Sequence, residues 1–178
     1  FHTVDLTKYF YMKYYTQEIN HSNKYGTQGK FASKYNDFIS MMLNHKDLSV
    51  IAPYNIVNCI YNRITMFQPG EQNDAHEFIN LFLENLHEDL NRISNKPYIT
   101  IEEQKDNESD IEAGERFWNY HKQREDSIII DLFYGQYKST TTCPDCNKQC
   151  ILYEPFNSIG LSIPEKIKLE TTLDSLKE

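Results

Sequence analysis

A Cys-x-x-Cys turn between two β-rich stretches is the feature that most limits how this chain can fold. Residues 127–163 contain two runs rich in β-branched and aromatic residues, joined by Cys143-Pro144-Asp145-Cys146. Two thiolates at this spacing can reach one ion, and structural zinc takes four ligands. The pattern therefore predicts a β hairpin whose tip holds half of a structural Zn²⁺ site, with Cys143 and Cys146 as ligands. Two ordinary surface cysteines in a tight turn are the alternative.

The number and spacing of the other cysteines bear on the cellular compartment of the protein. No second Cys-x-x-Cys pair follows, so we expect the remaining zinc ligands outside this chain. We predict that Cys150 is a strand residue and that Cys59, which lies among apolar residues, is a buried structural thiol. The spacing of the four cysteines is not that of a secreted disulfide framework. It therefore favours an intracellular protein, cytoplasmic and/or nuclear. Because the chain begins at Phe1, we expect it to be a piece of a larger protein.

Apolar periodicity predicts an α+β fold, with helices first and antiparallel strands after them. The clearest helix runs from Asn73, its expected N-cap, to about Ile93, with a buried face of Phe78, Ile79, Phe82, Leu83, Leu86, Leu90 and Ile93. The other expected helices cover 5–15, 31–43, 53–64 and 115–123, and the expected strands cover 127–142 and 150–163.

These elements suggest three parts of the chain. Residues 1–125 are expected to form a helical subdomain that includes an exposed acidic loop at about 102–115. Residues 126–164 are expected to form the β hairpin with the Cys-x-x-Cys knuckle. Residues 165–178 read as the start of a further element that is truncated here. No apolar run is long enough to cross a membrane, so we expect no membrane partner.

Three carboxylates share one side of the 73–93 helix. Asp74, Glu77 and Glu84 lie within about 80° of one another at the helical 100° per residue. This row could bind arginines of a partner through charge-assisted hydrogen bonds, or it could be an ordinary solvated face. The net charge of −8 argues against nucleic acid and suits a basic partner.

No catalytic nucleophile can be assembled from these residues. Cys59 has neither glycines nor a helix N-terminus to activate it, and His76 and His87 read as packing or surface residues.

Longer stretches resemble the catalytic domain of a ubiquitin-specific protease, a papain-like cysteine deubiquitinase. QNDAHEFINLFLENLHEDLNRISNKPYI is similar to that family's Gln-Gln-Asp helix, with Asn73 in place of the second glutamine. SIIIDLFYGQYKSTTTCPDCNK is similar to its first finger strands, and PFNSIGLSIP to the strand that returns toward the palm. HEDLNR and the later Trp118 and His121 resemble the subgroup that often carries ubiquitin-like domains.

The resemblance implies the helical thumb and first finger hairpin of a thumb–palm–fingers fold. It implies ubiquitin and ubiquitinated proteins as partners, and hydrolysis of the bond after the C-terminal glycine of ubiquitin. Asp74, Glu77 and Glu84 match positions that face ubiquitin's arginine-rich tail, and Cys143 and Cys146 match the first pair of finger zinc ligands. The family's cysteine box would precede Phe1 and its histidine box would follow Glu178. We therefore predict no catalytic residue in this chain and no activity of the chain alone. A catalytically dead ubiquitin-binding scaffold and an unrelated zinc-knuckle adaptor are the alternatives.

Overall fold

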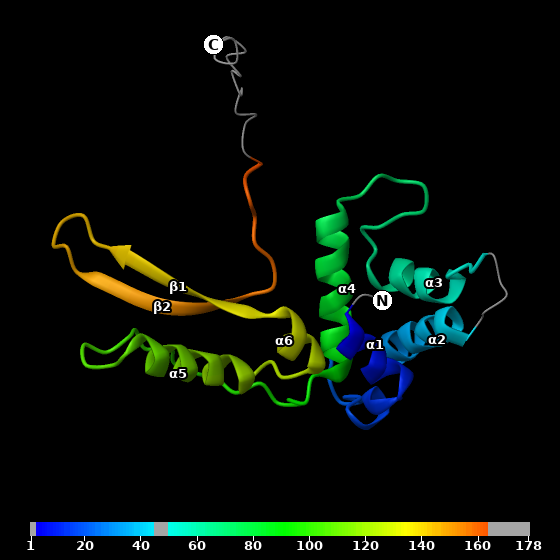
Figure 1. Cartoon of the computed structure of the whole chain (residues 1–178), viewed down its shortest axis with the longest axis horizontal. Coiled ribbons are helices and arrows are strands. Elements are labelled where there is room, and N and C mark those ends of the chain that lie inside the picture. The colour runs from blue at the N-terminus through cyan, green and yellow to red at the C-terminus, as the bar shows by residue number, and fades with distance from the viewer. Residues whose placement is uncertain (1–2, 45–49, 164–178) are drawn as a thin grey trace, which may run out of the picture.

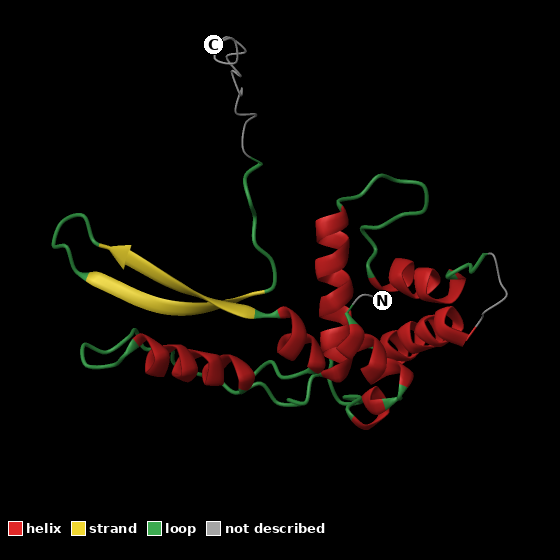
Figure 2. Cartoon of the chain, in the orientation of Figure 1, coloured by secondary structure: helices red, strands yellow, loops and turns green. Residues whose placement is uncertain are grey.

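Helices occupy the first part of the chain and a β hairpin follows, as Figures 1 and 2 show. The computed structural model describes residues 3–44 and 50–163, so the expected element at 165–178 lies outside the described residues. The α+β class is confirmed. The elements are α1 (Val4–Tyr11), the 3₁₀ helix η1 (Tyr14–Gln17), α2 (Lys30–Asn44), α3 (Tyr54–Arg63), α4 (Ala75–Leu90), α5 (Asp110–Lys122), α6 (Ile128–Phe133), β1 (Gly135–Thr142) and β2 (Gln149–Phe156).

The helices α1 to α4 and α6 surround one apolar core. Aromatic rings fill much of it: Phe31 lies edge-on to Phe82 with centroids 5.2 Å apart, and Tyr35 contacts the same ring at 5.3 Å. The apolar stripe predicted for residues 31–43 is confirmed at Phe31 and Ile39, which have no exposed surface. The fully buried side chains of this core are Phe10, Phe31, Ala32, Ile39, Leu86, Leu90 and Ile129.

The α4 helix begins one residue later than the sequence suggested. Asp74, not Asn73, is its N-cap, and the Asp74 carboxylate accepts hydrogen bonds from the backbone N–H groups of His76 and Glu77. The buried residues of α4 all lie in its C-terminal half. Ile79, expected on the buried face, is 54% exposed because the first turns of the helix lie at the edge of the core.

The expected first strand is wrong over its first half, because residues 128–133 form α6. The β-branched run favours a strand locally, but Ser127 caps the N-terminus of a helix there: its Oγ accepts from the N–H groups of Ile129 and Ile130. Both isoleucines are buried, and α6 packs on α4. Tertiary burial therefore overrides the local preference.

The α5 helix packs on the hairpin, although it lies before residue 125, where the sequence suggested that the helical subdomain ends. Figure 1 shows α5 running alongside β1 and β2. A second apolar core joins Ala113 and Phe117 of α5 to Tyr153 of β2. The helix starts at Asp110, after a capping box between Ser109 and Glu112, so the acidic loop ends earlier than predicted.

The hairpin itself is regular. Its strands pair antiparallel from Gly135 opposite Phe156 to Thr142 opposite Gln149, and β2 ends at Phe156 rather than at 163. The acidic loop runs along the β2 edge, where the Gln104 N–H donates to the Ile151 carbonyl at 3.0 Å. No helix within the described residues is long and apolar enough to cross a membrane.

Candidate functional site

The acidic row of Asp74, Glu77 and Glu84 lies on the exposed side of α4. All three side chains are exposed, and none forms an ion pair with a cation in the described part of the chain. Asp74 Oδ1 lies 2.7 Å from the His76 nitrogen, so one carboxylate oxygen caps the helix while the other stays open to solvent. A negative side chain at this position also suits the positive end of the helix dipole.

The row spans about 15 Å along the helix axis, at 1.5 Å per residue. Carboxylates spread over this length suit an extended segment with several cations better than a single ion. Next to the row, Asn80 contacts His76 Nε2 at 2.9 Å and accepts from Asn157 at 3.3 Å. The chain that leaves β2 therefore touches the helix that carries the row.

Two buried polar contacts hold α4 in place. Asp89, with no exposed surface, accepts hydrogen bonds from the N–H groups of Phe31 and Ala32 at 3.1 Å each, and so caps α2 from a neighbouring helix. Arg63 of α3 donates through Nε to Asn85 Oδ1 at 2.8 Å. The acidic row thus stands on a helix that is fixed to its neighbours, as a binding surface requires.

A pocket of about 270 Å³ opens beside Glu84 and also contacts His87, Glu88, His121 and Glu125. Burial alone would raise the pKa of Glu125, but hydrogen bonds from His87 and Lys96 outweigh it, and the pKa is lowered. Burial lowers the pKa of His121, which stacks on Tyr134 with ring centroids 5.8 Å apart. The pocket is therefore lined by one carboxylate, Glu125, that favours its ionised form and by one histidine, His121, that favours its neutral form.

His87, Glu88 and Glu125 are the one group of three possible metal-ligating side chains within the described residues. The Lys96 ammonium already lies between the two carboxylates, 3.1 Å from Glu88 and 2.7 Å from Glu125. It supplies the positive charge that a metal ion would bring, so this group carries no metal assignment.

The same region holds a Ser–His–Glu arrangement that sequence reasoning missed. His87 Nδ1 lies 2.8 Å from Ser127 Oγ and its Nε2 lies 2.9 Å from Glu125. Ser127 has no exposed surface, and its hydroxyl accepts the two amides at the start of α6. A substrate could not reach this oxygen, so the arrangement is structural. The serine before an apolar run was the sequence signal that could have identified this cap.

The cysteine turn lies at the tip of the hairpin, between β1 and β2. The Cys143 N–H donates to the Lys148 carbonyl at 2.9 Å and closes the turn. Backbone N–H groups of Cys146 and Asp145 and the Cys146 thiol hydrogen-bond the Cys143 sulfur and lower its pKa. The Cys146 side chain is thus within reach of the Cys143 sulfur, and thiolate, the zinc-binding form, is favoured. The residues present fit half of a zinc site.

The remaining cysteines behave differently. Cys150 lies in β2 opposite Thr141, as the sequence predicted, and a hydrogen bond with Glu103 raises the pKa of its thiol. Cys59 on α3 is half-buried rather than buried, and this partial burial raises the pKa of its thiol. A raised pKa favours the unreactive thiol, which supports a structural role for Cys59.

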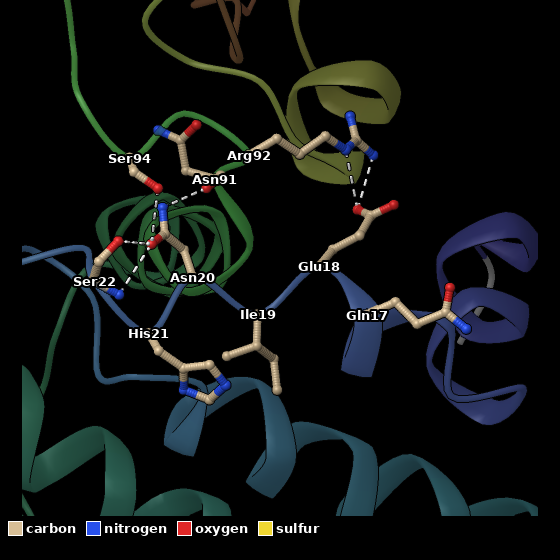
Figure 3. Close-up of a pocket in the computed structure, with 9 residues that line it drawn as sticks. All are labelled: Gln17, Glu18, Ile19, Asn20, His21, Ser22, Asn91, Arg92 and Ser94. Atoms are coloured by element: carbon tan, nitrogen blue, oxygen red, sulfur yellow. Dashed lines mark hydrogen bonds and ion pairs between the residues drawn. The ribbon is translucent and has the colours of Figure 1, made fainter.

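A larger pocket of about 410 Å³ lies between residues 17–22 and 91–94 (Figure 3). Its arginine, Arg92, is turned toward Glu18, with Nη2 and Oε2 2.9 Å apart. The amide of Asn20 is held by Ser22 and the Asn91 carbonyl. The polar groups of this pocket serve the fold, so we assign it no ligand.

A helical bundle with an acidic helix, joined to a hairpin with a cysteine turn, is part of an α+β domain of the papain-like protease type. A family model described as "Ubiquitin carboxyl-terminal hydrolase" matches residues 1–176. The chain therefore belongs to the ubiquitin carboxyl-terminal hydrolase family, as a ubiquitin-specific protease, and the unrelated adaptor is excluded.

Individual relatives support the same assignment. The chain is 37% identical over 172 residues to ubiquitin carboxyl-terminal hydrolase 15 of Homo sapiens, a match that covers 97% of this chain and 17% of that protein. It is 34% identical over 172 residues to ubiquitin carboxyl-terminal hydrolase 10 of Arabidopsis thaliana, covering 97% of this chain and 18% of the relative. The chain thus spans less than a fifth of the length of these relatives.

Proposed function

We propose that this chain is the thumb and first finger hairpin of a cysteine deubiquitinase, which hydrolyses the isopeptide or peptide bond after the C-terminal glycine of ubiquitin. The names of the relatives support the activity. The observation in this chain that supports ubiquitin binding is the exposed row of Asp74, Glu77 and Glu84, which pairs with no cation in the described part of the chain. Ubiquitin and ubiquitinated proteins are the proposed partners.

The contribution of these residues is to bind and orient. Carboxylates along α4 pair with the basic side chains of the ubiquitin tail and hold it extended, which places the scissile bond. Binding energy from such remote contacts lowers the entropic cost of bringing bond and nucleophile together. The nucleophile and its histidine partner are expected on other parts of the protein, so we assign no chemical step to this chain.

The knuckle has a structural part in this proposal. Cys143 and Cys146 would supply two thiolate ligands to a Zn²⁺ ion, and the second pair is expected outside this chain. The ion would fix the tip of the hairpin, where the apolar core formed by α5 and β2 does not reach.

Substitutions at Asp74 separate charge from helix capping. Asp74→Asn keeps a good N-cap but removes the charge, whereas Asp74→Ala removes both. In the full-length protein, we expect Asp74→Asn to lower kcat/KM for a ubiquitin C-terminal fluorogenic substrate by about tenfold or more, the loss of one charge-assisted hydrogen bond. Glu77→Gln should act in the same direction. The matched control is Glu115→Gln, because Glu115 is an exposed carboxylate on α5 that forms no ion pair with any described residue.

Two outcomes would contradict the proposal. If Asp74→Asn behaved like the wild type while Asp74→Ala was impaired, the cap rather than the charge would matter, and tail binding would be wrong. If the full-length protein bound ubiquitin through the acidic row but hydrolysed nothing, it would be the catalytically dead scaffold. Turnover by the isolated 178-residue chain would contradict the prediction that it lacks catalytic residues.

A further inference from the structure

Five cations gather around the loop between η1 and α2, and Lys96 is the one of them that is paired with carboxylates, Glu88 and Glu125, within the described residues. We define the basic patch as Lys24, Lys30, Arg63, Lys96 and Arg124. Lys24, Lys96 and Arg124 line a pocket of about 440 Å³ on one side of this loop. Lys30 and Arg63 line a pocket of about 480 Å³ formed with the next residues of the same loop, 26–28. The basic patch is therefore continuous along loop residues 22–30.

Tyr25 lies at the centre of the basic patch. Its ring is 65% exposed and lies 5.5 Å from the Lys96 ammonium, measured to the ring centroid. Its backbone carbonyl accepts a hydrogen bond from the Arg63 guanidinium. These contacts place cations from α3 and from the loop after α4 on the same loop, although they lie far apart in the sequence.

In this region the cations are exposed, whereas the neighbouring carboxylates are largely buried. Lys24, Lys30 and Arg63 are exposed, and within the described residues none of them forms an ion pair with a carboxylate. The neighbouring carboxylates face inward: Asp89 has no exposed surface and the Glu88 side chain is 15% exposed. Solvent therefore meets positive charge here, in a chain whose net charge is −8.

We propose that the basic patch is a docking site for a short acidic peptide segment of a partner protein. Two shallow, adjoining pockets suit an extended chain, and Ser22, Asn95 and Gln28 offer side-chain hydrogen bonds to a peptide backbone. A long polyphosphate chain fits less well, because it would extend beyond the patch along a chain whose net charge is −8. This site is separate from the acidic row and does not rest on the proposed function.

The test measures binding of a fluorescein-labelled peptide of alternating acidic residues and glycines by fluorescence anisotropy, using the full-length protein. We expect binding that weakens with rising salt, and no binding of the same peptide with Asn and Gln in place of Asp and Glu. Lys24→Glu combined with Lys30→Glu should weaken binding by at least about tenfold, because two favourable charge contacts become repulsive. Lys30 begins α2, where a glutamate is tolerated by the helix.

Lys8→Glu combined with Lys13→Glu is the matched control, since both lysines are exposed, lie outside the basic patch and have no carboxylate partner among residues 3–44 and 50–163. Binding to this control should stay within about twofold of the wild type. Lys24→Ala, a single change in an exposed loop, serves if the double variant does not fold. No binding of the acidic peptide, equal loss in both double variants, or tighter patch-dependent binding of single-stranded DNA would each overturn the proposal.

Discussion

Replacing Asp89 by asparagine should detach α2 from α4 and disturb the helix that carries the acidic row. The Asp89 carboxylate accepts hydrogen bonds from the Thr27 hydroxyl at 2.7 Å and from the N–H groups of Phe31 and Ala32 at 3.1 Å each, in addition to the Thr27 N–H. Every one of these partners is a donor. The asparagine amide would have to point its own NH₂ group at some of them.

The expected loss follows from this geometry. Whichever way the amide turns, at least one buried backbone N–H loses its acceptor, which costs about 1–3 kcal/mol. The hydrogen bonds that remain change from charged to neutral acceptors and each weakens by about 1 kcal/mol. We therefore expect the free energy of opening of the α2 N-terminus to fall by about 3 kcal/mol, with the side-chain volume nearly unchanged.

Hydrogen exchange followed by mass spectrometry can measure this in the full-length protein. Peptides covering residues 26–44 should exchange about a hundredfold faster in Asp89→Asn, the equivalent of about 3 kcal/mol. Asp37→Asn, which removes an exposed ion pair with Lys34 on the same helix, should change exchange less than about threefold. Protection of residues 26–44 in Asp89→Asn that matches the Asp37 control would refute the reasoning.

Three further outcomes follow from other parts of the structure. Tyr153→Phe removes the hydrogen bond from the tyrosine hydroxyl to Asp110 (3.0 Å) and should destabilise the α5–hairpin unit by about 1 kcal/mol, measured by exchange of β2 amides. Because the folded state lowers the pKa of Glu125, its ionised form stabilises the protein above the ordinary value of 4.5, and this contribution is lost as pH falls through the lower folded-state pKa. Glu125→Gln should therefore flatten the acid-unfolding curve; a curve as steep as that of the wild type would be contrary evidence. Cys143→Ser in the full-length protein should release bound zinc, measured by elemental analysis, and a wild-type preparation without zinc would defeat the knuckle.

The sequence predicted the helices correctly where apolar residues recur with the helical period. The helical stripes at Phe31 and Ile39 and the strong helix after Asp74 are confirmed, because amphipathic periodicity reports directly on which side is buried. The hairpin with its cysteine turn is likewise present, since the turn chemistry and the β-branched strands point the same way.

The failures lie where tertiary contacts decide. The run at 128–133 has a strand-like composition, but the Ser127 cap and burial against α4 make it a helix. The packing of α5 on the hairpin was not predicted, because its partner, Tyr153, lies far along the chain and local periodicity does not report long-range contacts. Buried polar contacts such as those of Asp89 and His87 have no periodic signal, so only the structure identifies them. The roles of the acidic row and the knuckle stay predictions.

The packing of α5 along the hairpin sets a limit on length. At about 1.5 Å per residue, the 13 residues of α5 span about 20 Å, while the 8 residues of β1 span about 27 Å at about 3.4 Å each. A relative that lengthened the hairpin alone would add strand that the helix cannot cover, leaving its new residues without an apolar partner. Insertions should therefore come in matched sets, about two helical turns for every three added residue pairs. The length of α5 therefore limits how much of the hairpin has an apolar partner.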